Sequence, residues 1–306
     1  MNRLLILLIV CCLFQSCQKE IFIENQGGIS KPVIEGYIEL GEYPYVILTK
    51  SIPYFSTVNS ENFLNHILIS DATVCVTSSD GITDTLRYTI NFNALALAPM
   101  AYTGSKFKGE VGKTYRLDID YEGTHFTAHT TIEPPFEIDS FWFAKNDDRD
   151  TNASCRILMT DNLSCTNYYQ FMTKVQNADR LLDPYWVGTI PIAFDDQLFA
   201  GKTFNYEILR AYPSTLFGNM FSDDKDRKNY NRMTYSWGDT VYLKYCSIDR
   251  DSYKYWSTVS FGDSPFIMSP PAYTNISGGD CFGIWCGRSY KIDTLIIPKW
   301  EYPQNN

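Results

Sequence analysis

The feature that most constrains the fold is a strict alternation of apolar and polar side chains at residues 115–131, YRLDIDYEGTHFTAHTT. Apolar or aromatic residues occupy every second position from 115 to 121, and the positions between them are charged. This period is typical of a β-strand with one buried face and one face in water. Glu122 and Gly123 interrupt the alternation, which resumes at Phe126 and Ala128 and indicates an antiparallel hairpin.

The same two-residue period occurs on both sides of this hairpin. Residues 34–40 alternate in IEGYIEL, and Asp80-Gly81 is a strong turn signal between two short alternating runs. A Pro-Pro pair at 134–135 ends this first block, since proline cannot supply the ladder hydrogen bond of a central strand. Further strands are predicted after it at SFWFA, CRILMT, YYQFMTKV, TFNYEIL and DTVYLKYCSI.

These patterns predict an all-β protein with minor helix, built from two β-sandwich-like domains. We expect an N-terminal β-sandwich of the immunoglobulin-like or prealbumin-like kind at residues 29–133. A larger antiparallel β domain is expected at residues 134–306. Helical spacing is limited to two short stretches, around residues 59–68 and 251–261.

The first 20 residues, MNRLLILLIVCCLFQSCQKE, have the order of a secretory signal. Arg3 precedes 11 apolar residues, Leu4–Phe14, a run too short to span a membrane as a helix. The small residue directly before Cys17 resembles a bacterial lipobox. We therefore predict a lipoprotein signal peptide at residues 1–16, acyl chains on Cys17 and a linker at residues 17–28. An ordinary cleavage site near Cys17 is the alternative.

The residues that follow Cys17 predict where the protein lies. Gln18, Lys19 and Glu20 resemble the polar tract that sends lipoproteins of Bacteroidetes to the outer cell surface. A solvated linker would have the same composition. We expect a lipid-anchored protein of the outer membrane, held to the bilayer by its N-terminal acyl chains and exposed on the cell surface.

The charge of the chain disfavours nucleic acid as a partner. The formal net charge is -9 and the isoelectric point is near 4.9. Proteins that bind nucleic acid carry a basic patch as their electrostatic footprint, and the sequence has no run of lysine and arginine.

Six cysteines follow Cys17, and an oxidising cell envelope favours their pairing. The segment SCRILMTDNLSC predicts a strand and an Asp-Asn turn, so Cys155 and Cys165 could face each other across a hairpin. Cys281 and Cys286 could close a small loop. A zinc site is the alternative, but the C-x-x-C spacing of structural zinc sites is missing, and we predict disulfides.

Residues suited to catalysis are scarce. The chain has only His66, His125 and His129, and the last two lie about 13 Å apart on a predicted strand, too far for one ion at that face. No G-x-S-x-G elbow supports a Ser-His-Asp triad. Residues 118–129 lack the final glutamate of a calcium loop. We predict no catalytic residue, metal site or cofactor, and solvated turns at Asp147-Asp148, Asp195-Asp196 and Asp223-Asp224.

Aromatic side chains are the strongest candidates for binding, because tyrosine and tryptophan stack on sugars and peptides. The chain has 22 Tyr and 6 Trp, most of which we expect in strand faces and cores. Candidates for an exposed patch are the loop residues Tyr43, Tyr45, Tyr54 and Phe55, and a second-domain cluster of Tyr185, Trp186, Tyr273 and Trp285.

Five segments have the order and spacing of a known family: VIEGYIELGEYPYVILTKSIPY, GKTYRLDIDYEGTHFTAHTTIEPP, TDNLSCTNYYQF, SIDRDSYKYWSTV and SPFIMSPPAYTNISGGDCFGIW. Together they resemble the Bacteroidetes lipoprotein family known as domain of unknown function 4249 (DUF4249), over nearly the whole mature chain. The family's glycine-rich end is plainer, whereas Asp280, Cys281 and Cys286 interrupt it here. The resemblance implies a lipoprotein encoded near TonB-dependent outer-membrane transporters, and it brings no catalytic residues.

We therefore expect a non-catalytic outer-membrane lipoprotein that is an accessory or ligand-binding partner of a TonB-dependent nutrient transporter. A glycan or a peptide is the expected ligand, because aromatic residues dominate the candidate surfaces. Two other classes stay open at this point. One is a hydrolase of envelope or other polymers, and the other is a structural or adhesive surface protein.

Overall fold

The computed structural model describes residues 30–52, 67–90, 100–145, 152–176, 186–210, 235–259 and 272–299. The strands before residue 133 are β1 (Pro32–Glu39), β2 (Tyr45–Lys50), β3 (Thr73–Ser78), β4 (Thr83–Thr85), β5 (Arg87–Ile90), β6 (Met100–Thr103), β7 (Thr114–Tyr121) and β8 (Thr124–Thr131). Those after it are β9 (Ser140–Lys145), β10 (Asn152–Thr160), β11 (Tyr168–Gln176), β12 (Val187–Asp195), β13 (Thr203–Ile208), β14 (Tyr235–Ser236), β15 (Thr240–Ile248) and β16 (Phe282–Ile296). Helix α4 (Arg250–Val259) confirms the predicted C-terminal helix, and the helix predicted at residues 59–68 falls almost wholly outside the described residues.

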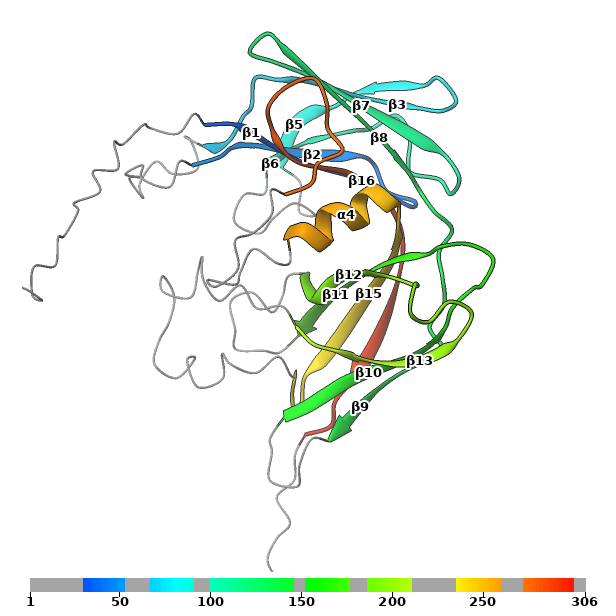
Figure 1. Cartoon of the computed structure of the whole chain (residues 1–306). Coiled ribbons are helices and arrows are strands. Elements are labelled where there is room, and N and C mark those ends of the chain that lie inside the picture. Colours follow the sequence, from blue (N-terminus) through cyan, green and yellow to red (C-terminus); the bar gives the residue numbers. More distant parts are fainter. Residues whose placement is uncertain are drawn as a thin grey trace, which may run out of the picture.

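Three sheets form two sandwiches that share one large sheet (Figure 1). The large sheet has eight strands in the order β12-β11-β15-β16-β1-β2-β6-β5. The sheet β4-β3-β7-β8 packs on its β1 half, and the sheet β13-β10-β14, with β9 paired to β10, packs on its β15 half. The prediction of an all-β, sandwich-like fold is confirmed.

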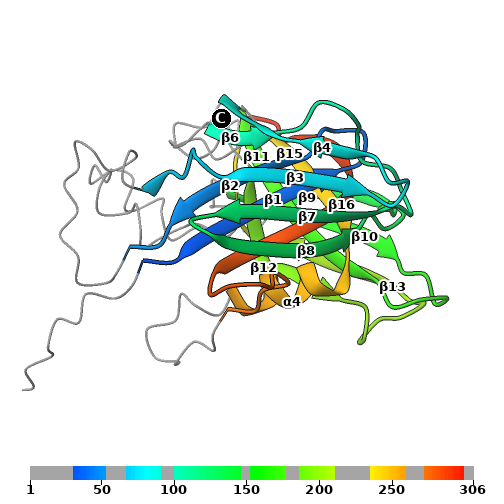
Figure 2. The same cartoon turned by 90° about the horizontal axis from the view of Figure 1, so that it is seen from above.

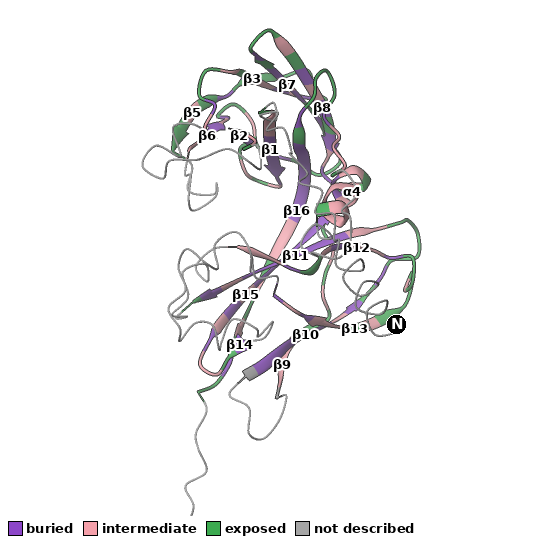
Figure 3. Ribbon diagram, turned by 60° about the vertical axis from the view of Figure 1, so that its left-hand side comes forward, coloured by how far each residue is buried: buried purple, intermediate pink, exposed green. Residues whose placement is uncertain are grey.

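Strand β16 joins the two halves of the large sheet because it changes partner midway. Residues 282–288 pair in parallel with β1, and residues 288–296 pair antiparallel with β15, so Arg288 belongs to both registers. Figure 3 shows β16 buried along β1 and less buried along β15. The large sheet thus contains strands from both sides of residue 133, and the predicted division into two domains there stays a prediction.

The hairpin predicted at residues 115–131 is confirmed as β7 and β8, which lie side by side in Figure 2. Glu122 and Gly123 have φ values of 47° and 76°, the left-handed conformation that a two-residue turn of this kind requires. Gly81, with φ 83°, supplies the left-handed residue of the longer turn between β3 and β4. Local turn chemistry and alternation therefore determine this layer.

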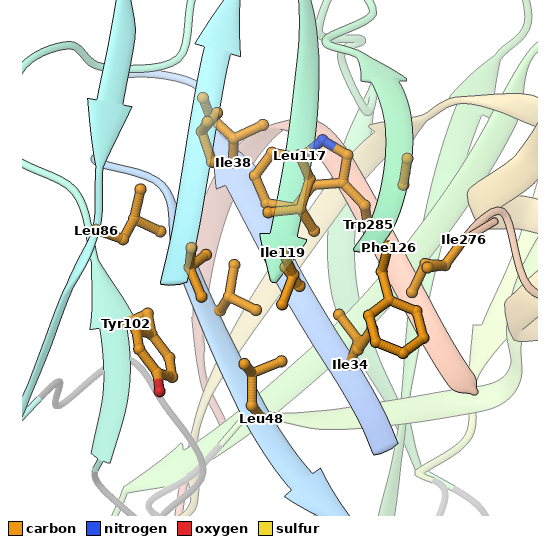
Figure 4. Packing of buried hydrophobic residues seen from close by; sticks show 14 of the residues in the cluster. Ile34, Ile38, Leu48, Leu86, Tyr102, Leu117, Ile119, Phe126, Ile276 and Trp285 are labelled. Carbon is orange, nitrogen blue, oxygen red and sulfur yellow. The ribbon is translucent and has the colours of Figure 1, made fainter. Parts of the chain in front are cut away.

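The core of the first sandwich surrounds Trp285, which is 0% exposed (Figure 4). Its indole Nε1 donates a hydrogen bond to the backbone oxygen of Tyr115 at 2.9 Å, so the buried donor is satisfied. A Cβ at Gly36 would lie 2.6 Å from the Trp285 ring. Gly283 has φ 120°, and a Cβ there would lie 1.8 Å from the carbonyl oxygen of Ile34. These two glycines let β16 and its tryptophan pack directly on β1.

Helix α4 lies on the other face of the large sheet and is fixed there by Asp249. One oxygen of the Asp249 carboxylate accepts the backbone N–H of Ser252 at 2.8 Å, which caps the helix. The other oxygen accepts the hydroxyl of Thr130 at 2.5 Å, and that hydroxyl accepts the backbone N–H of Gly287 at 2.6 Å. The cap thus links the helix to β8 and β16.

Candidate functional site on the large sheet

One face of the large sheet carries cations among aromatic rings, and we call it the basic aromatic face. Side chains alternate along a strand. The even-numbered residues of β15 and β16 therefore share this face, and their odd-numbered neighbours enter the two sandwich cores. The basic aromatic face consists of Tyr37, Glu39, Lys174, Trp186, Tyr242, Lys244, Arg288 and Tyr290.

The centre of this face is a buried group of the Glu39 carboxylate and two cations, and a second carboxylate, Glu35, accepts the hydroxyl of Tyr37 at 2.5 Å beside it. Lys244 Nζ lies 2.8 Å from each carboxylate oxygen of Glu39, and Arg288 Nε lies 2.5 Å from one of them. All three residues are 8% exposed or less. Such a group tolerates burial only because its members are paired and hydrogen-bonded.

The pKa values of this group follow from its burial and from the charges of its members. Burial raises the pKa of Glu39, but the charges of Arg288 and Lys244 outweigh burial and hold it below its ordinary value. Burial lowers the pKa of Lys244, and the charge of Arg288 lowers it further against the opposing effect of Glu39. Glu39 therefore stays ionised, and it compensates two cations at once.

Aromatic rings surround the cations that Glu39 does not fully compensate. The guanidinium of Arg288 lies 4.2 Å from the centre of the Tyr37 ring, and Lys244 Nζ lies 4.1 Å from the centre of the Tyr290 ring. Arg288 also donates to the side-chain oxygen of Gln170 at 3.2 Å. The negative faces of the rings stabilise both cations.

Lys174 forms a second cationic position on the same face. Its Nζ lies 5.4 Å from the ring centre of Trp186 and 5.3 Å from that of Tyr242. Lys174 is half-buried, and within the part of the chain that the structure describes it forms no ion pair with a carboxylate. An ammonium group held between two rings can accept an anionic ligand.

Exposure increases along this face with distance from α4. Where the helix covers the sheet, Tyr168 of β11 stacks on Tyr253 of α4 with ring centres 5.0 Å apart, and Arg288 is 6% exposed. At the far end of β16, Ile292 and Ile296 are 45% and 70% exposed. The face therefore changes from a buried ionic centre to an open surface that is both apolar and basic.

The structure does not bring the predicted binding aromatics together. Trp186 lies on the basic aromatic face, but Tyr273 packs against α4, where its hydroxyl donates to Asp251 at 2.7 Å. Trp285 is a core residue, which corrects its assignment to an exposed patch. Its ring points into the sandwich core over Gly36 of β1, which has no side chain to block it, and this position determines its burial. Tyr185 lies outside the described residues.

The predicted loop aromatics also separate. Tyr43 is 41% exposed with Lys108 over its ring, whereas Tyr45 is buried against Tyr37 with ring centres 5.4 Å apart. Tyr54 and Phe55 lie outside the described residues.

The predicted disulfides are not formed, since Cys155, Cys165, Cys281 and Cys286 are all free. Cys155 lies in β10, whereas the next strand, β11, joins the large sheet, so the two strands form no hairpin. Cys281 and Cys286 are five residues apart on extended chain, an odd separation that puts them on opposite faces of the sheet. Burial raises their thiol pKa values to about 11 and about 12, which makes both poor nucleophiles.

The histidines and acidic pairs show no catalytic arrangement within the described ranges. His125 and His129 are exposed on β8 as predicted, and His125 lies 2.8 Å from Asp120. Asp196 is buried, unlike the predicted solvated turn, and it accepts the backbone N–H of Asn167 at 2.6 Å. No group of three or more His, Cys, Asp and Glu residues in the described part of the chain could hold a metal ion. Outside the described residues lie Cys17, His66, Asp147-Asp148 and Asp223-Asp224.

Sequence reasoning missed Glu39, Lys244 and Arg288. Alternation assigns Lys244 to the face opposite Leu243, and for a two-layer sandwich that face is expected in water. A signal was present in β15, where Cys246 and Ile248 continue the Lys244 face with apolar side chains. Apolar side chains that follow a polar one on the same face of a strand indicate that another element packs on that face.

A model of a protein family described as Domain of unknown function (DUF4249) matches residues 21–280, which is most of the chain. The matched range includes Glu39, Lys174, Trp186, Tyr242 and Lys244, whereas Arg288 and Tyr290 follow it. No curated protein matches the chain. Within the described ranges, none of the helical segments has the length and apolar character needed to cross a bilayer.

Proposed function

Because this chain belongs to the DUF4249 family, whose function is unknown, we propose its function from its own residues. We propose that it is a non-catalytic lipoprotein of the outer membrane that binds a ligand and assists a TonB-dependent nutrient transporter. The lipid anchor is proposed on Cys17 from the lipobox-like sequence before it. The transporter is proposed from the family resemblance.

The basic aromatic face is the observation that supports a binding role. Apart from Trp186, which directly precedes β12, its side chains come from strands of the large sheet, so backbone ladders fix their positions. Rigid placement favours affinity, because a preorganised site loses little conformational entropy when a ligand binds. Rings beside an ammonium that has no carboxylate partner among the described residues are suited to recognition, and they provide no nucleophile.

The chemistry of the buried thiols supports a non-catalytic role. Burial raises the pKa of Cys246 to about 11, close to the value for Cys281, and a nucleophilic cysteine needs a lowered pKa. Burial also raises the pKa values of Tyr37 and Tyr290. These groups hold their protons at neutral pH and serve as packing and stacking surfaces.

Affinity purification from gently solubilised outer membranes tests the partnership. A C-terminally tagged full-length chain is captured, and the proteins that accompany it are identified by mass spectrometry. A transporter recovered in stoichiometric amount is the expected result. Repeated recovery of the chain alone would refute the accessory role and leave a self-contained binding protein.

Fractionation of Cys17→Ala tests the anchor. We expect the variant to leave the membrane fraction, because the acyl chains on Cys17 supply the membrane affinity. Cys165→Ala is the matched control, since Cys165 is an exposed cysteine in the folded part and its loss should leave the protein on the membrane. Membrane retention of Cys17→Ala would contradict the lipid anchor.

A further inference from the structure

We propose that the open end of the basic aromatic face binds an organic anion, with the acid group on Lys174 and an apolar or planar body along β16. This inference rests on the proposed binding function and names the chemical class of the ligand. It starts from the half-buried ammonium of Lys174, which lies between the rings of Trp186 and Tyr242 and has no carboxylate partner in the described part of the chain.

The strand register places apolar surface beside this ammonium. Lys174 pairs with Tyr242 of β15, and Tyr242 pairs with Thr294 of β16. Neighbouring strands are about 4.8 Å apart, so Thr294 lies about 10 Å from Lys174 across the sheet. Ile292 and Ile296 flank Thr294 on the same face and are 45% and 70% exposed. A ligand about 10 Å long would reach from the cation to these isoleucines.

The polar groups around Lys174 favour an anion over a cation or a neutral body. Tyr242 donates its hydroxyl proton to the side-chain oxygen of Gln176 at 2.6 Å, which leaves the Gln176 amide hydrogens as further donors. Glu39, the carboxylate at the centre of the face, already binds Lys244 and Arg288. Among the described residues, the positive charge at Lys174 is thus left for a ligand.

Calorimetry with a matched pair of probes tests the inference on the full-length chain in a mild detergent. The probes are 2-naphthoate and 2-naphthamide, which share a planar apolar body and differ in the negative charge. Titration of detergent alone is subtracted. We expect naphthoate to bind at least about tenfold more tightly than naphthamide, because a charge-assisted hydrogen bond to a partly buried lysine contributes more than a neutral one.

Variants of Lys174 assign the binding to this position. Lys174→Met keeps the aliphatic stem and should weaken naphthoate binding about tenfold, while Lys174→Arg should restore it. Lys202→Met, at an exposed lysine outside the face, should leave it unchanged. Ile296→Asp, at a position 70% exposed and so tolerant of a polar residue, should also weaken naphthoate binding by adding a like charge. Matching urea midpoints show that the variants are folded.

Three results would overturn the inference. They are naphthoate binding that Lys174→Met does not weaken, equal affinity for the two probes, and failure of the unmodified protein to bind naphthoate. These outcomes are independent of the proposed function, which is measured by partner capture and membrane retention. Failure of naphthoate binding alone removes the ligand class and leaves the tethered accessory role in place.

Discussion

The substitution Glu39→Gln is expected to destabilise the protein far more than any loss of a surface ion pair. Glu39 accepts hydrogen bonds from Lys244 at 2.8 Å on both oxygens and from Arg288 at 2.5 Å, and it is 8% exposed. Glutamine preserves the shape but removes the carboxylate to which both buried cations are hydrogen-bonded. Removing one partner from a buried ion pair costs about 3–5 kcal/mol.

The protonation of Lys244 sets an upper limit to its part of this cost. A buried lysine that loses its carboxylate partner can lose its proton instead. The unfolded pKa of lysine is about 10.4, which is about 3.4 units above pH 7, and each unit corresponds to about 1.36 kcal/mol. Deprotonation at pH 7 therefore costs about 4.6 kcal/mol. The folded pKa of Lys244 is already lowered, by burial first and by Arg288 second. Because the unfolded chain then binds more protons, the stability of Glu39→Gln should rise with pH between the folded pKa of Lys244 and about 10.4.

Urea unfolding followed by tryptophan fluorescence measures this prediction. At pH 7 we expect Glu39→Gln to lose about 3–5 kcal/mol of unfolding free energy, and its deficit relative to the unmodified protein should shrink by pH 9. Glu110→Gln is the control, since Glu110 forms an exposed pair with Lys113 at 2.9 Å and should lose no more than about 1 kcal/mol.

The stability at acidic pH gives a second check, and the direction of its change follows from the pKa of Glu39. The pKa of Glu39 is lowered in the folded state, so its contribution is present above about 4.3 and is lost as the pH falls through the folded pKa. Because glutamine does not titrate, Glu39→Gln should lose less stability than the unmodified protein as the pH falls through this range. Equal destabilisation by Glu39→Gln and Glu110→Gln at pH 7 would refute the assignment of a buried, compensated ion group.

Two further predictions test the strand contact and the thiols. Gly283→Ala should unfold the protein or lower its unfolding free energy by more than about 3 kcal/mol, because the added Cβ would overlap the carbonyl of Ile34. The control Gly81→Ala, at a left-handed position in open space, should lower it by about 1–2 kcal/mol. Similar urea midpoints for the two variants would contradict the close approach of β16 to β1. In the native protein at pH 8, iodoacetamide should label exposed Cys165 and spare buried Cys286. After denaturation without reductant, mass spectrometry should find both cysteines labelled. A disulfide-linked peptide would refute the free thiols.

Local patterns in the sequence predict the strands well, and they fail where distant segments meet. The hairpin at residues 115–131 follows from alternation and from a turn at Glu122-Gly123, all within one short segment. The parallel pairing of β1 with β16 joins residues about 250 positions apart, and no local signal specifies it. The hairpin proposed from Cys155 to Cys165 was wrong for the same reason, because the chain changes sheets between those residues.

The candidate site was only partly predictable because it depends on that distant pairing. Trp186 was identified from its residue type, but nothing near it in the sequence indicates Lys174 or Tyr242 as its neighbours. Glu39 meets Lys244 and Arg288 only because β16 passes from β1 to β15 at position 288. Residue types indicated aromatic binding, and the topology determined which aromatics lie beside a cation.

The net charge of the chain and the charge of the proposed site act over different distances. The chain carries a formal charge of -9, whereas on the face Lys244 and Arg288 pair with Glu39 and Lys174 lies apart from that pair, between two rings. At physiological ionic strength charges are screened beyond about 8 Å, so a small anion in contact with Lys174 is affected mainly by that lysine. A long polyanion would also meet the acidic remainder of the surface. The balance therefore favours a compact anion of about 10 Å with a single acid group, the class that the strand register accommodates.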